Sequence, residues 1–480
     1  MMDKDLQSIQ QARDLIRKAA EAQEEFMQLN REHIDAIVER VAKAASDASE
    51  SLARMAMEET GFGKWKDKFS KNKLASEKVY ESIKDMKTIG VIREDEEKNI
   101  IEIGTPVGVI TALIPSTNPT STVIYKTLIA LKSGNAIVFS PHPSAMRCIL
   151  KTVEILNEAA MEVGAPEGLI GCLSMLTIEG TNELMKNEDV ALILATGGSA
   201  MVKAAYSSGT PALGVGPGNV PAFIERSADI KEAVAKILES KTFDNGTVCA
   251  SEQSIVTERC IAEEVKKELI HQGGYFLTGE KLQKIVKIME RPNGDMNPKI
   301  VGKSAQDIAE MADIEIPRET RVLVCEEKGV GKQYPFSKEK LTALLGFYTV
   351  GNWEEACELS FALLRNGGLG HTLVIHSKDE QIIREFALKK PVSRLLVNTP
   401  STQGAVGLST NLAPALTLGC GAIGGNATSD SVTPMHLVNI RRVAYDTGHY
   451  RCQAGQEDGM KGIDIEQIIK LVEERLKQYS

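Results

Sequence analysis

The sequence predicts an α/β protein with a doubly wound parallel sheet, and two observations carry this prediction. After Asn99, short apolar runs close at Gly, Pro or Ser, as in GVITALIPSTNPT, AIVFSPHPSA, LIGCLSML and LILATGGSAMV. Each run is followed by a stretch of helical periodicity. Buried strands that alternate with helices form parallel sheets, which bind ligands beyond the carboxyl ends of their strands. We therefore expect the residues that close these runs to lie near a ligand site.

A helical lead-in precedes the first predicted strand. From Leu6 to about Lys87, apolar residues recur at three- and four-residue intervals, the period of amphipathic helices. The pattern is clear in Ile9, Ala12, Ile16 and Ala19, and again in Ile34, Ile37, Val38 and Val41.

A second α/β unit follows the stretch GVGPGNVPAF, so we place a domain boundary near Phe223. Helical patterns at 230–240 and 261–271 alternate in this unit with strand candidates at 321–325, 372–376 and 394–398. The sequence thus divides into regions 1–223, 224–415, 416–450 and 451–480, of which 416–450 returns to the first unit.

Composition and charge exclude several classes of protein. A chain of 480 residues exceeds the size of one hydrophobic core, which predicts at least two domains. The formal net charge is −9 and basic residues are scattered, so we expect no nucleic-acid partner. The polar start is unlike a signal peptide, and no apolar run approaches the roughly 20 residues needed to cross a bilayer. We therefore expect a cytoplasmic protein with no membrane partner.

The cysteines indicate reduced thiols. Eight cysteines are spread along the chain without a CxxC pair, so neither a disulfide framework nor a zinc site is predicted. Seven histidines include no HExxH arrangement, and we expect no metal. Cys249 differs from the others because it lies among small and polar residues in FDNGTVCASEQS, which suits an exposed thiol whose thiolate is stabilised by backbone N–H groups. Cys420, in TLGCGAIGG, is its rival as nucleophile.

The end of the chain has a different character. A polar, Gly-containing linker, QAGQEDGMKG, precedes a segment at 463–479 with aliphatic residues on one helical face. This helix either packs on its own enzyme or a sister subunit, or docks into a groove of another protein.

Several motifs in order resemble the CoA-acylating branch of the aldehyde dehydrogenase superfamily. They are IPSTNPTS, SPHPSA, ATGGSAMV, GVGPGNVPA, FDNGTVCASEQ, SRLLVNTPSTQG and LTLGCGAIGGNATSD, and the likeness covers roughly residues 5–450. The resemblance implies a Rossmann-like cofactor domain, with the lead-in, in 1–223 and an α/β catalytic domain in 224–415. It also implies an oligomerisation arm drawn from segments near 95–103 and 426–446.

The resemblance assigns the nucleophile to Cys249, which attacks the aldehyde carbon and forms a thioacyl-enzyme after hydride transfer. It assigns stabilisation of the oxyanion to the Asn118 amide and the Cys249 backbone N–H. From the residues alone, Asn118 fits an Asx turn before Pro119.

One departure from the superfamily concerns the acyl acceptor. Hydrolytic members carry a glutamate that activates water at the position of Val215, in GVGPGN. Because valine cannot act as a base, this favours CoA over water. We expect acetaldehyde or propionaldehyde as substrate, while butyraldehyde, sulfoacetaldehyde and succinate semialdehyde remain open. A hydrolytic aldehyde dehydrogenase and a non-catalytic cargo or assembly protein are the alternatives.

The resemblance also nominates residues for binding the cofactor, which is NAD, with NADP not excluded, and the co-substrate CoA. The candidates for cofactor binding are Ser140, Pro141, His142, Thr196, Gly197, Gly198, Ser199 and Glu339. The candidates for the wall of the aldehyde and CoA pocket are Thr399, Ser401, Thr402 and Cys420.

The tail has a counterpart in the resemblance as well. Some acylating enzymes of bacterial microcompartments carry a short amphipathic helix on a linker, and residues 463–479 look like such an encapsulation peptide. This implies shell proteins as partners, a location inside a bacterial microcompartment and a homo-oligomer, either a dimer or a tetramer.

Overall fold

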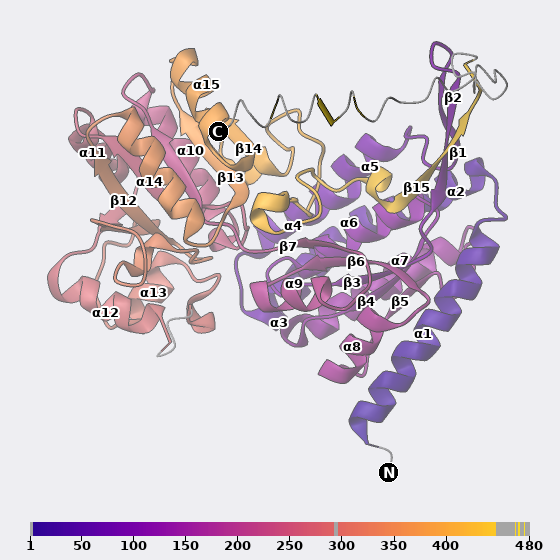
Figure 1. Cartoon of the computed structure of the whole chain (residues 1–480). Coiled ribbons are helices and arrows are strands. Elements are labelled where there is room, and N and C mark those ends of the chain that lie inside the picture. Colours follow the sequence, from indigo (N-terminus) through magenta and orange to yellow (C-terminus); the bar gives the residue numbers. More distant parts are fainter. Residues whose placement is uncertain (1–2, 292–295, 448–465, 467–468, 471–474, 476–480) are drawn as a thin grey trace.

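The chain folds into two lobes, each built on a parallel sheet, as a computed structural model shows (Figure 1). The structure describes residues 3–291, 296–447, 466, 469–470 and 475. The predicted α/β class with parallel sheets is confirmed. Most of the predicted helix at 463–479 lies outside the described residues.

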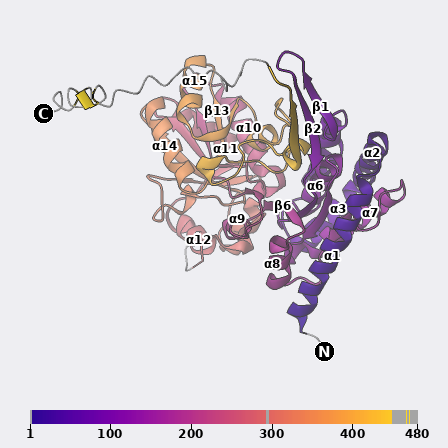
Figure 2. The ribbon, with the colours of Figure 1, turned by 45° about the vertical axis from the view of Figure 1, so that its right-hand side comes forward.

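The predicted helical lead-in is confirmed and covers one lobe along its outer side (Figures 1 and 2). Its residues are helical because the three- and four-residue spacing buries one face, including Ile16 and Ala19, and because Asp3 and Asn30 cap the first two helices. The helices are α1 (Lys4–Phe26), α2 (Arg31–Asp47), α3 (Ser49–Thr60), α4 (Trp65–Lys73), the π-helical turn η1 (Leu74–Lys78) and α5 (Val79–Ile83).

The first sheet has five parallel strands in the order β5-β4-β3-β6-β7. The strands are β3 (Val109–Leu113), β4 (Ala136–Ser140), β5 (Ile170–Cys172), β6 (Val190–Thr196) and β7 (Ala212–Val215). The helices that connect them are α6 (Pro119–Lys132), η2 (Pro143–Ala145), α7 (Met146–Met161), α8 (Ile178–Lys186) and α9 (Ser199–Tyr206). The motifs that close the predicted strands therefore gather at the carboxyl edge of this sheet.

The second sheet has seven parallel strands in the order β10-β11-β12-β9-β8-β13-β14. The strands are β8 (Val220–Ile224), β9 (Glu252–Glu258), β10 (Gly274–Phe276), β11 (Val322–Glu326), β12 (Leu344–Val350), β13 (Gly370–His376) and β14 (Val392–Val397). The longer helices are α10 (Ile230–Thr242), α11 (Ala262–His271), α12 (Gly279–Met289), α13 (Ala305–Met311), α14 (Trp353–Arg365), α15 (Glu380–Lys389) and α16 (Ser401–Ala405). The short helices are η3 (Phe243–Gly246), η4 (Pro298–Ile300), η5 (Pro335–Ser337), η6 (Ala422–Gly424) and η7 (Pro434–Leu437).

The change from one sheet to the other comes a few residues before the boundary expected near Phe223. Phe223 lies inside β8, which pairs with β9 and β13 of the seven-stranded sheet. The chain leaves the first sheet after Val215, so the crossing falls in residues 216–219. The expected boundary places the apolar run of β8 in the first unit. Buried parallel strands of either sheet have the same apolar pattern, so the sequence does not distinguish them.

A separate three-stranded antiparallel sheet projects from the helix-covered lobe (Figures 1 and 2). It is formed by β1 (Gly90–Asp95), β2 (Ile100–Pro106) and β15 (Val438–Ala444), in the order β1-β2-β15. The segments expected to form an arm, near 95–103 and 426–446, therefore do meet, through the pairing of β2 with β15.

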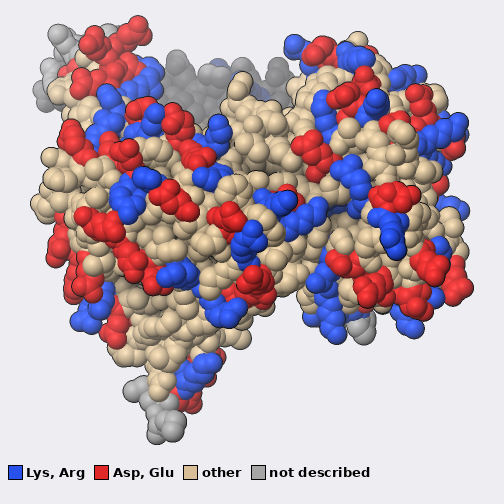
Figure 3. All heavy atoms as spheres, turned by 180° about the vertical axis from the view of Figure 1, so that it is seen from behind, with Lys and Arg blue, Asp and Glu red and all other residues tan. Residues whose placement is uncertain are grey.

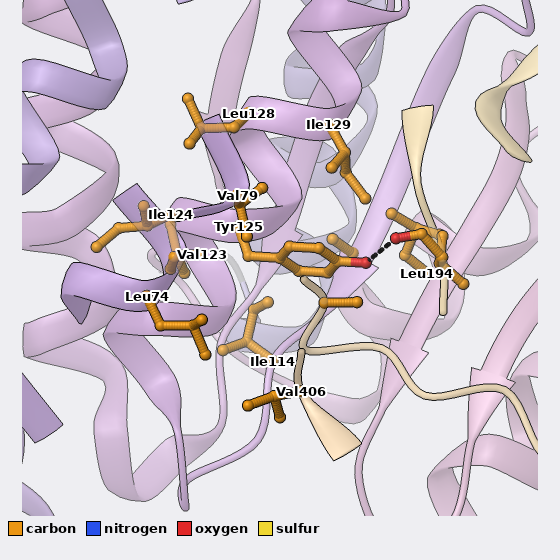
Figure 4. Packing of buried hydrophobic residues seen from close by; sticks show 14 of the residues in the cluster. Leu74, Val79, Ile114, Val123, Ile124, Tyr125, Leu128, Ile129, Leu194 and Val406 are labelled. Atoms are coloured by element: carbon orange, nitrogen blue, oxygen red, sulfur yellow. Dashed lines mark hydrogen bonds between the residues drawn. The ribbon is translucent and has the colours of Figure 1, made fainter. Parts of the chain in front are cut away.

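Helix α6 runs through the core beside the helical lead-in. Every residue from Pro119 to Lys132 is buried, and the hydroxyl of Tyr125 donates a hydrogen bond to the carbonyl of Val432. Figure 4 shows Leu74 and Val79 of the lead-in in the same apolar cluster as Tyr125. Because α6 is packed on all sides, Asn118 at its amino end is held in a fixed place.

The surface mixes charges of both signs. On the face drawn in Figure 3, Lys and Arg are interspersed with Asp and Glu. Among the described residues, no helix combines the length and the apolar character that a membrane span requires.

Candidate active site

A cavity of about 280 Å³ lies where the two lobes meet, at the carboxyl ends of β3, β6 and β7 and in front of β9. It receives side chains from the helical lead-in and from both lobes. The residues predicted from the sequence that line it are Asn118, His142, Thr196, Gly197, Gly198, Cys249, Glu339 and Thr402.

The remaining predicted residues do not line this cavity. The hydroxyl groups of Ser140 and Thr399 are hydrogen-bonded to other side chains. Ser140 Oγ lies 2.9 Å from Thr181 Oγ1, and Thr399 Oγ1 lies 2.6 Å from Ser409 Oγ. Ser199 and Cys420 line an adjoining hollow that shares Gly216 and Pro217 with the main cavity. Pro141 and Ser401 line neither space.

The loop that carries Cys249 is shaped by a run of left-handed residues. Asp244 and Asn245 have φ of 48° and 51°, and Gly246 has φ of 78°. The loop also packs tightly on the GVGPGN segment, because a Cβ on Gly218 would lie 2.0 Å from the carbonyl oxygen of Cys249. The glycine at 218 is therefore needed for the nucleophile loop to approach so closely.

The Cys249 thiol is half-buried and is protonated at neutral pH. Burial raises its pKa to about 12, the carboxyl of Glu339 and the thiol of Cys420 add to this rise, and the Arg394 guanidinium partly opposes it. Backbone hydrogen bonding does lower the pKa of this thiol, as expected, but its effect is smaller than that of burial. Low dielectric around the sulfur outweighs those dipoles, so the thiol must lose its proton during the reaction.

Glu339 lies in the same cavity as Cys249. Its carboxylate accepts a hydrogen bond of 2.9 Å from the backbone N–H of Gly218. Burial raises the pKa of Glu339 to about 7, although the N–H of Gly218 and the charges of Lys241 and Lys340 oppose the rise. Near neutral pH the carboxyl group therefore changes between a proton donor and an acceptor of hydrogen bonds.

Asn118 precedes the first turn of α6, but its side chain makes no hydrogen bond to the backbone of the helix. The Oδ1 atom accepts a hydrogen bond of 2.6 Å from Lys71 Nζ, and Nδ2 donates one of 3.2 Å to Thr117 Oγ1. The Asx turn that the sequence left open is thus not formed. One N–H of the amide is left for the cavity, which Asn118 lines.

Several residues of the site were not predicted from the sequence. Lys71, Ser70 and Leu74 reach the cavity from α4 and η1 of the lead-in. Burial lowers the pKa of Lys71 to about 8, while Asp244 opposes this shift. Lysines at helical spacing are typical of a solvated face, so the sequence held no signal that this one is buried.

Arg394 was not predicted either. Its guanidinium donates hydrogen bonds to the backbone carbonyls of His371 and Gly419, and these contacts depend on long-range packing.

The turn after β6 has the features of a phosphate cradle. Gly198 precedes α9 without a capping side chain, and no atom lies within 4 Å of the position that its Cβ would occupy. Thr196 Oγ1 is buried without a hydrogen-bond partner among the described residues. Free N–H groups at a helix start, open space and an unsatisfied hydroxyl fit an anionic group such as the pyrophosphate of a dinucleotide.

His142 lies in the same cavity and is uncharged. Burial lowers the pKa of its imidazole, and Nδ1 accepts a hydrogen bond of 3.1 Å from the backbone N–H of Ser144. The proton of the neutral ring is therefore on Nε2, which makes His142 a hydrogen-bond donor.

Known proteins resemble this chain in sequence and in structure. The sequence matches the aldehyde dehydrogenase family over residues 5–336. It is 45% identical over 435 residues to the bifunctional aldehyde-alcohol dehydrogenase AdhE of Escherichia coli K12, an alignment that covers 90% of this chain and 49% of that protein. The chain thus spans about half the length of the bifunctional relatives that it matches.

Solved structures agree with this match. A probable aldehyde dehydrogenase from Listeria monocytogenes EGD-e is 60% identical, with a TM-score of 0.91 and coverage of 93% of this chain and 98% of that one. An acetylating aldehyde dehydrogenase from Geobacillus thermoglucosidasius is 53% identical, with a TM-score of 0.92 and coverage of 94% and 100%.

More distant structures have TM-scores of 0.83 and cover 90% of this chain and 96–97% of their own. One is a propionaldehyde dehydrogenase from the fucose utilisation microcompartment of Clostridium phytofermentans, 29% identical. Another, 28% identical, is the propionaldehyde dehydrogenase of Rhodopseudomonas palustris with bound CoA and an acylated cysteine. A third, 27% identical, is an engineered glycolyl-CoA reductase with bound NADP⁺.

Proposed function

Because the chain belongs to the aldehyde dehydrogenase family, among its acylating members, we propose that it is a CoA-acylating aldehyde dehydrogenase. The reaction converts an aldehyde, CoA and NAD⁺ into an acyl-CoA, NADH and a proton. Acetaldehyde and propionaldehyde are the substrates that we propose. The apolar side chains that line the cavity, among them Phe243, Val248 and Leu416, support a short uncharged aldehyde.

The observation that carries this proposal is the wall of the cavity at Val215. This residue ends β7, is 4% exposed and faces the same space as Cys249. Where a water-activating carboxylate would be needed for hydrolysis, the wall presents only methyl groups. The absence of a carboxylate at this position supports transfer of an acyl group from Cys249 to the thiol of CoA rather than to water.

The residues of the chain divide the chemistry as follows. Cys249 attacks the aldehyde carbon. Because the resting thiol is neutral, its proton is released to solvent during the attack and is the proton that the overall reaction produces. The backbone N–H of Cys249 and the free N–H of the Asn118 amide stabilise the oxyanion that develops. A nicotinamide held in this cavity would supply the hydride acceptor, and the thioester formed on Cys249 would be the acyl donor to CoA.

The cofactor is proposed to lie along the turn after β6. Thr196, Gly197 and Gly198 would hold its phosphates, His142 would donate a hydrogen bond to it, and the Glu339 carboxylate would accept from its ribose hydroxyls. NAD is the cofactor that we propose. Because a related structure contains bound NADP⁺, NADP⁺ is the alternative cofactor to be tried in the same assay.

The test is to measure NADH formation from acetaldehyde and from propionaldehyde with and without CoA, and to identify the product. We expect steady turnover only with CoA, and a thioester as the product. Steady turnover without CoA, with free acid as the product, would show that the enzyme is hydrolytic. No turnover with either aldehyde would favour the alternative of a non-catalytic assembly protein.

Assembly and location extend this proposal. The sheet of β1, β2 and β15 carries exposed apolar side chains on β15, Ile440 at 38% and Val443 at 39%, which supports a homo-oligomer, dimer or tetramer, built through this arm. Residues 463–479 are proposed to address the enzyme to the shell of a bacterial microcompartment. The related enzyme from a microcompartment supports this location.

A further inference from the structure

Lys71 makes a short contact with the amide of Asn118. Its Nζ lies 2.6 Å from Asn118 Oδ1, and Lys71 is 4% exposed. Lys71 comes from α4 in the helical lead-in, whereas Asn118 comes from the loop between β3 and α6. The contact therefore joins two elements that are distant in sequence at the edge of the cavity.

This contact decides which way the amide points. An ammonium group donates hydrogen bonds and accepts none, so the atom that faces Lys71 must be the amide oxygen. The NH₂ group then points the other way, where one N–H reaches Thr117 Oγ1 and the second is free. Rotating the amide by half a turn would place NH₂ against an ammonium and leave an oxygen in place of the donor.

Lys71 is itself held from several sides. Its Nζ lies 2.5 Å from Asp244 Oδ2 and 3.3 Å from the carbonyl oxygen of Thr247, both in the loop that carries Cys249. Asp244 is completely buried and forms a second ion pair with Lys68, in which Lys68 Nζ lies 3.0 Å from Asp244 Oδ2. The lysine thus spans the space between the nucleophile loop and the Asn118 amide, with little freedom to move.

We propose that Lys71 is a positioning residue, which fixes the Asn118 amide so that its free N–H faces the developing oxyanion on the Cys249 adduct. The proposal rests on the proposed function, in which Asn118 donates to that oxyanion. An oriented donor stabilises the transition state because it does not have to reorganise as charge develops. The ammonium also polarises the amide and strengthens its N–H as a donor.

A double-mutant cycle tests whether Lys71 acts through Asn118. Lys71→Met removes the ammonium and keeps an unbranched side chain, and Asn118→Ala removes the amide. We expect Lys71→Met to lower kcat by about 10- to 100-fold in the wild-type background, with a smaller change in KM, since losing an oxyanion donor costs about 10²- to 10³-fold. In the Asn118→Ala background, the same substitution is expected to change kcat by less than about threefold.

Lys68→Met is the matched control. Lys68 bonds the same carboxylate oxygen of Asp244 and donates to the backbone carbonyl of Thr117, but it has no hydrogen bond to the Asn118 side chain among the described residues. Its effect on kcat, whatever its size, should be the same with and without Asn118. If Lys71→Met lowers kcat by the same factor in both backgrounds, Lys71 acts independently of Asn118 and the proposal is wrong.

Two further measurements keep the proposal testable. If Lys71→Met does not fold, Lys71→Gln, which removes the charge but keeps a polar side chain beside Asp244, is taken through the same cycle, with the same coupling expected. A neutron structure of the folded variant, which distinguishes the amide oxygen from the NH₂ group, reads the orientation of the amide without turnover. We expect the Asn118 amide to rotate or to occupy two orientations, and an unchanged single orientation would overturn the proposal. Failure of the proposed function would appear separately, as a wild-type enzyme that makes no NADH.

Discussion

At the scale of single residues, the site combines a neutral thiol with groups that titrate near neutral pH. Cys249 is protonated at rest, while burial brings the pKa of Glu339 to about 7. The two groups share a cavity, and the charge on Glu339 is one of the causes that raise the pKa of Cys249. The state of Glu339 therefore affects both the binding of the cofactor and the ease with which the thiol ionises.

We predict that the affinity for the cofactor depends on the ionisation of Glu339. A raised pKa of about 7 means that the group is protonated below this pH and becomes a carboxylate, the better acceptor for ribose hydroxyls, above it. The dissociation constant of NAD should therefore fall between about pH 6 and pH 8, and this trend should be absent in Glu339→Gln. Fluorescence titration of both proteins across this range measures it. An equal pH dependence in the variant would assign the effect to another group.

The sequence located the residues of this site better than it described their environment. Cys249 and Asn118 could be proposed from the motifs around them, and both lie in one cavity. The protonation of the thiol could not be foreseen, since it depends on packing by Gly218 and Glu339, which approach from other segments. Lys71 was missed for the same reason.

At the scale of elements, the helical lead-in takes part in the site. Helix α4 supplies Lys68 and Lys71, whose ammonium groups meet the buried carboxylate of Asp244 in the nucleophile loop. Burial alone raises the pKa of Asp244, but the positive charges of Lys71 and Lys68 outweigh this and lower it. A segment that periodicity marks only as amphipathic helix thus fixes the shape of the loop before Cys249.

We predict that Asp244→Asn destabilises the protein by about 3–5 kcal/mol at neutral pH, because it leaves two buried ammonium groups without a counter-charge. Urea unfolding measures the loss. Asp47→Asn is the control, since Asp47 pairs with Lys43 at 2.9 Å on the surface, where both side chains are more than 60% exposed, and should cost at most about 1 kcal/mol. If both variants lose equal stability, the buried ion pairs do not hold the loop.

The predicted alternation of strands and helices gave β3, β4, β5 and β6 of the first sheet and β11, β13 and β14 of the second, because buried parallel strands leave a strong apolar signal. It could not assign every strand to its sheet. The boundary expected near Phe223 falls inside β8, which belongs to the second sheet, because strand order depends on long-range pairing that no local pattern records.

At the scale of the whole molecule, the chain places its catalytic cavity between two parallel sheets and its three-stranded sheet apart from it (Figure 1). The proposed catalysis and the proposed assembly therefore use different surfaces. The proposed encapsulation peptide follows β15 in sequence and is separated from it by a linker rich in Gly and polar residues.

We predict that deleting residues 455–480 leaves the melting temperature and the aldehyde-dependent turnover unchanged but abolishes co-localisation with a microcompartment shell. A fluorescent protein fused to residues 455–480 should enter shells on its own, because aliphatic side chains on one helical face suffice for docking in a groove. A truncated enzyme that melts at a much lower temperature, together with a fusion that stays outside shells, would show that this segment is structural.

The central claim, that Cys249 carries an acyl group which only CoA removes, is tested by trapping that group. The enzyme is incubated with acetaldehyde and NAD⁺ without CoA, and its intact mass is measured before and after CoA is added. We expect one acetyl group per chain, mapped to Cys249 by peptide analysis, absent in Cys249→Ala and released as acetyl-CoA. An acetyl group on Cys420, or one lost to water as quickly as to CoA, would contradict the account.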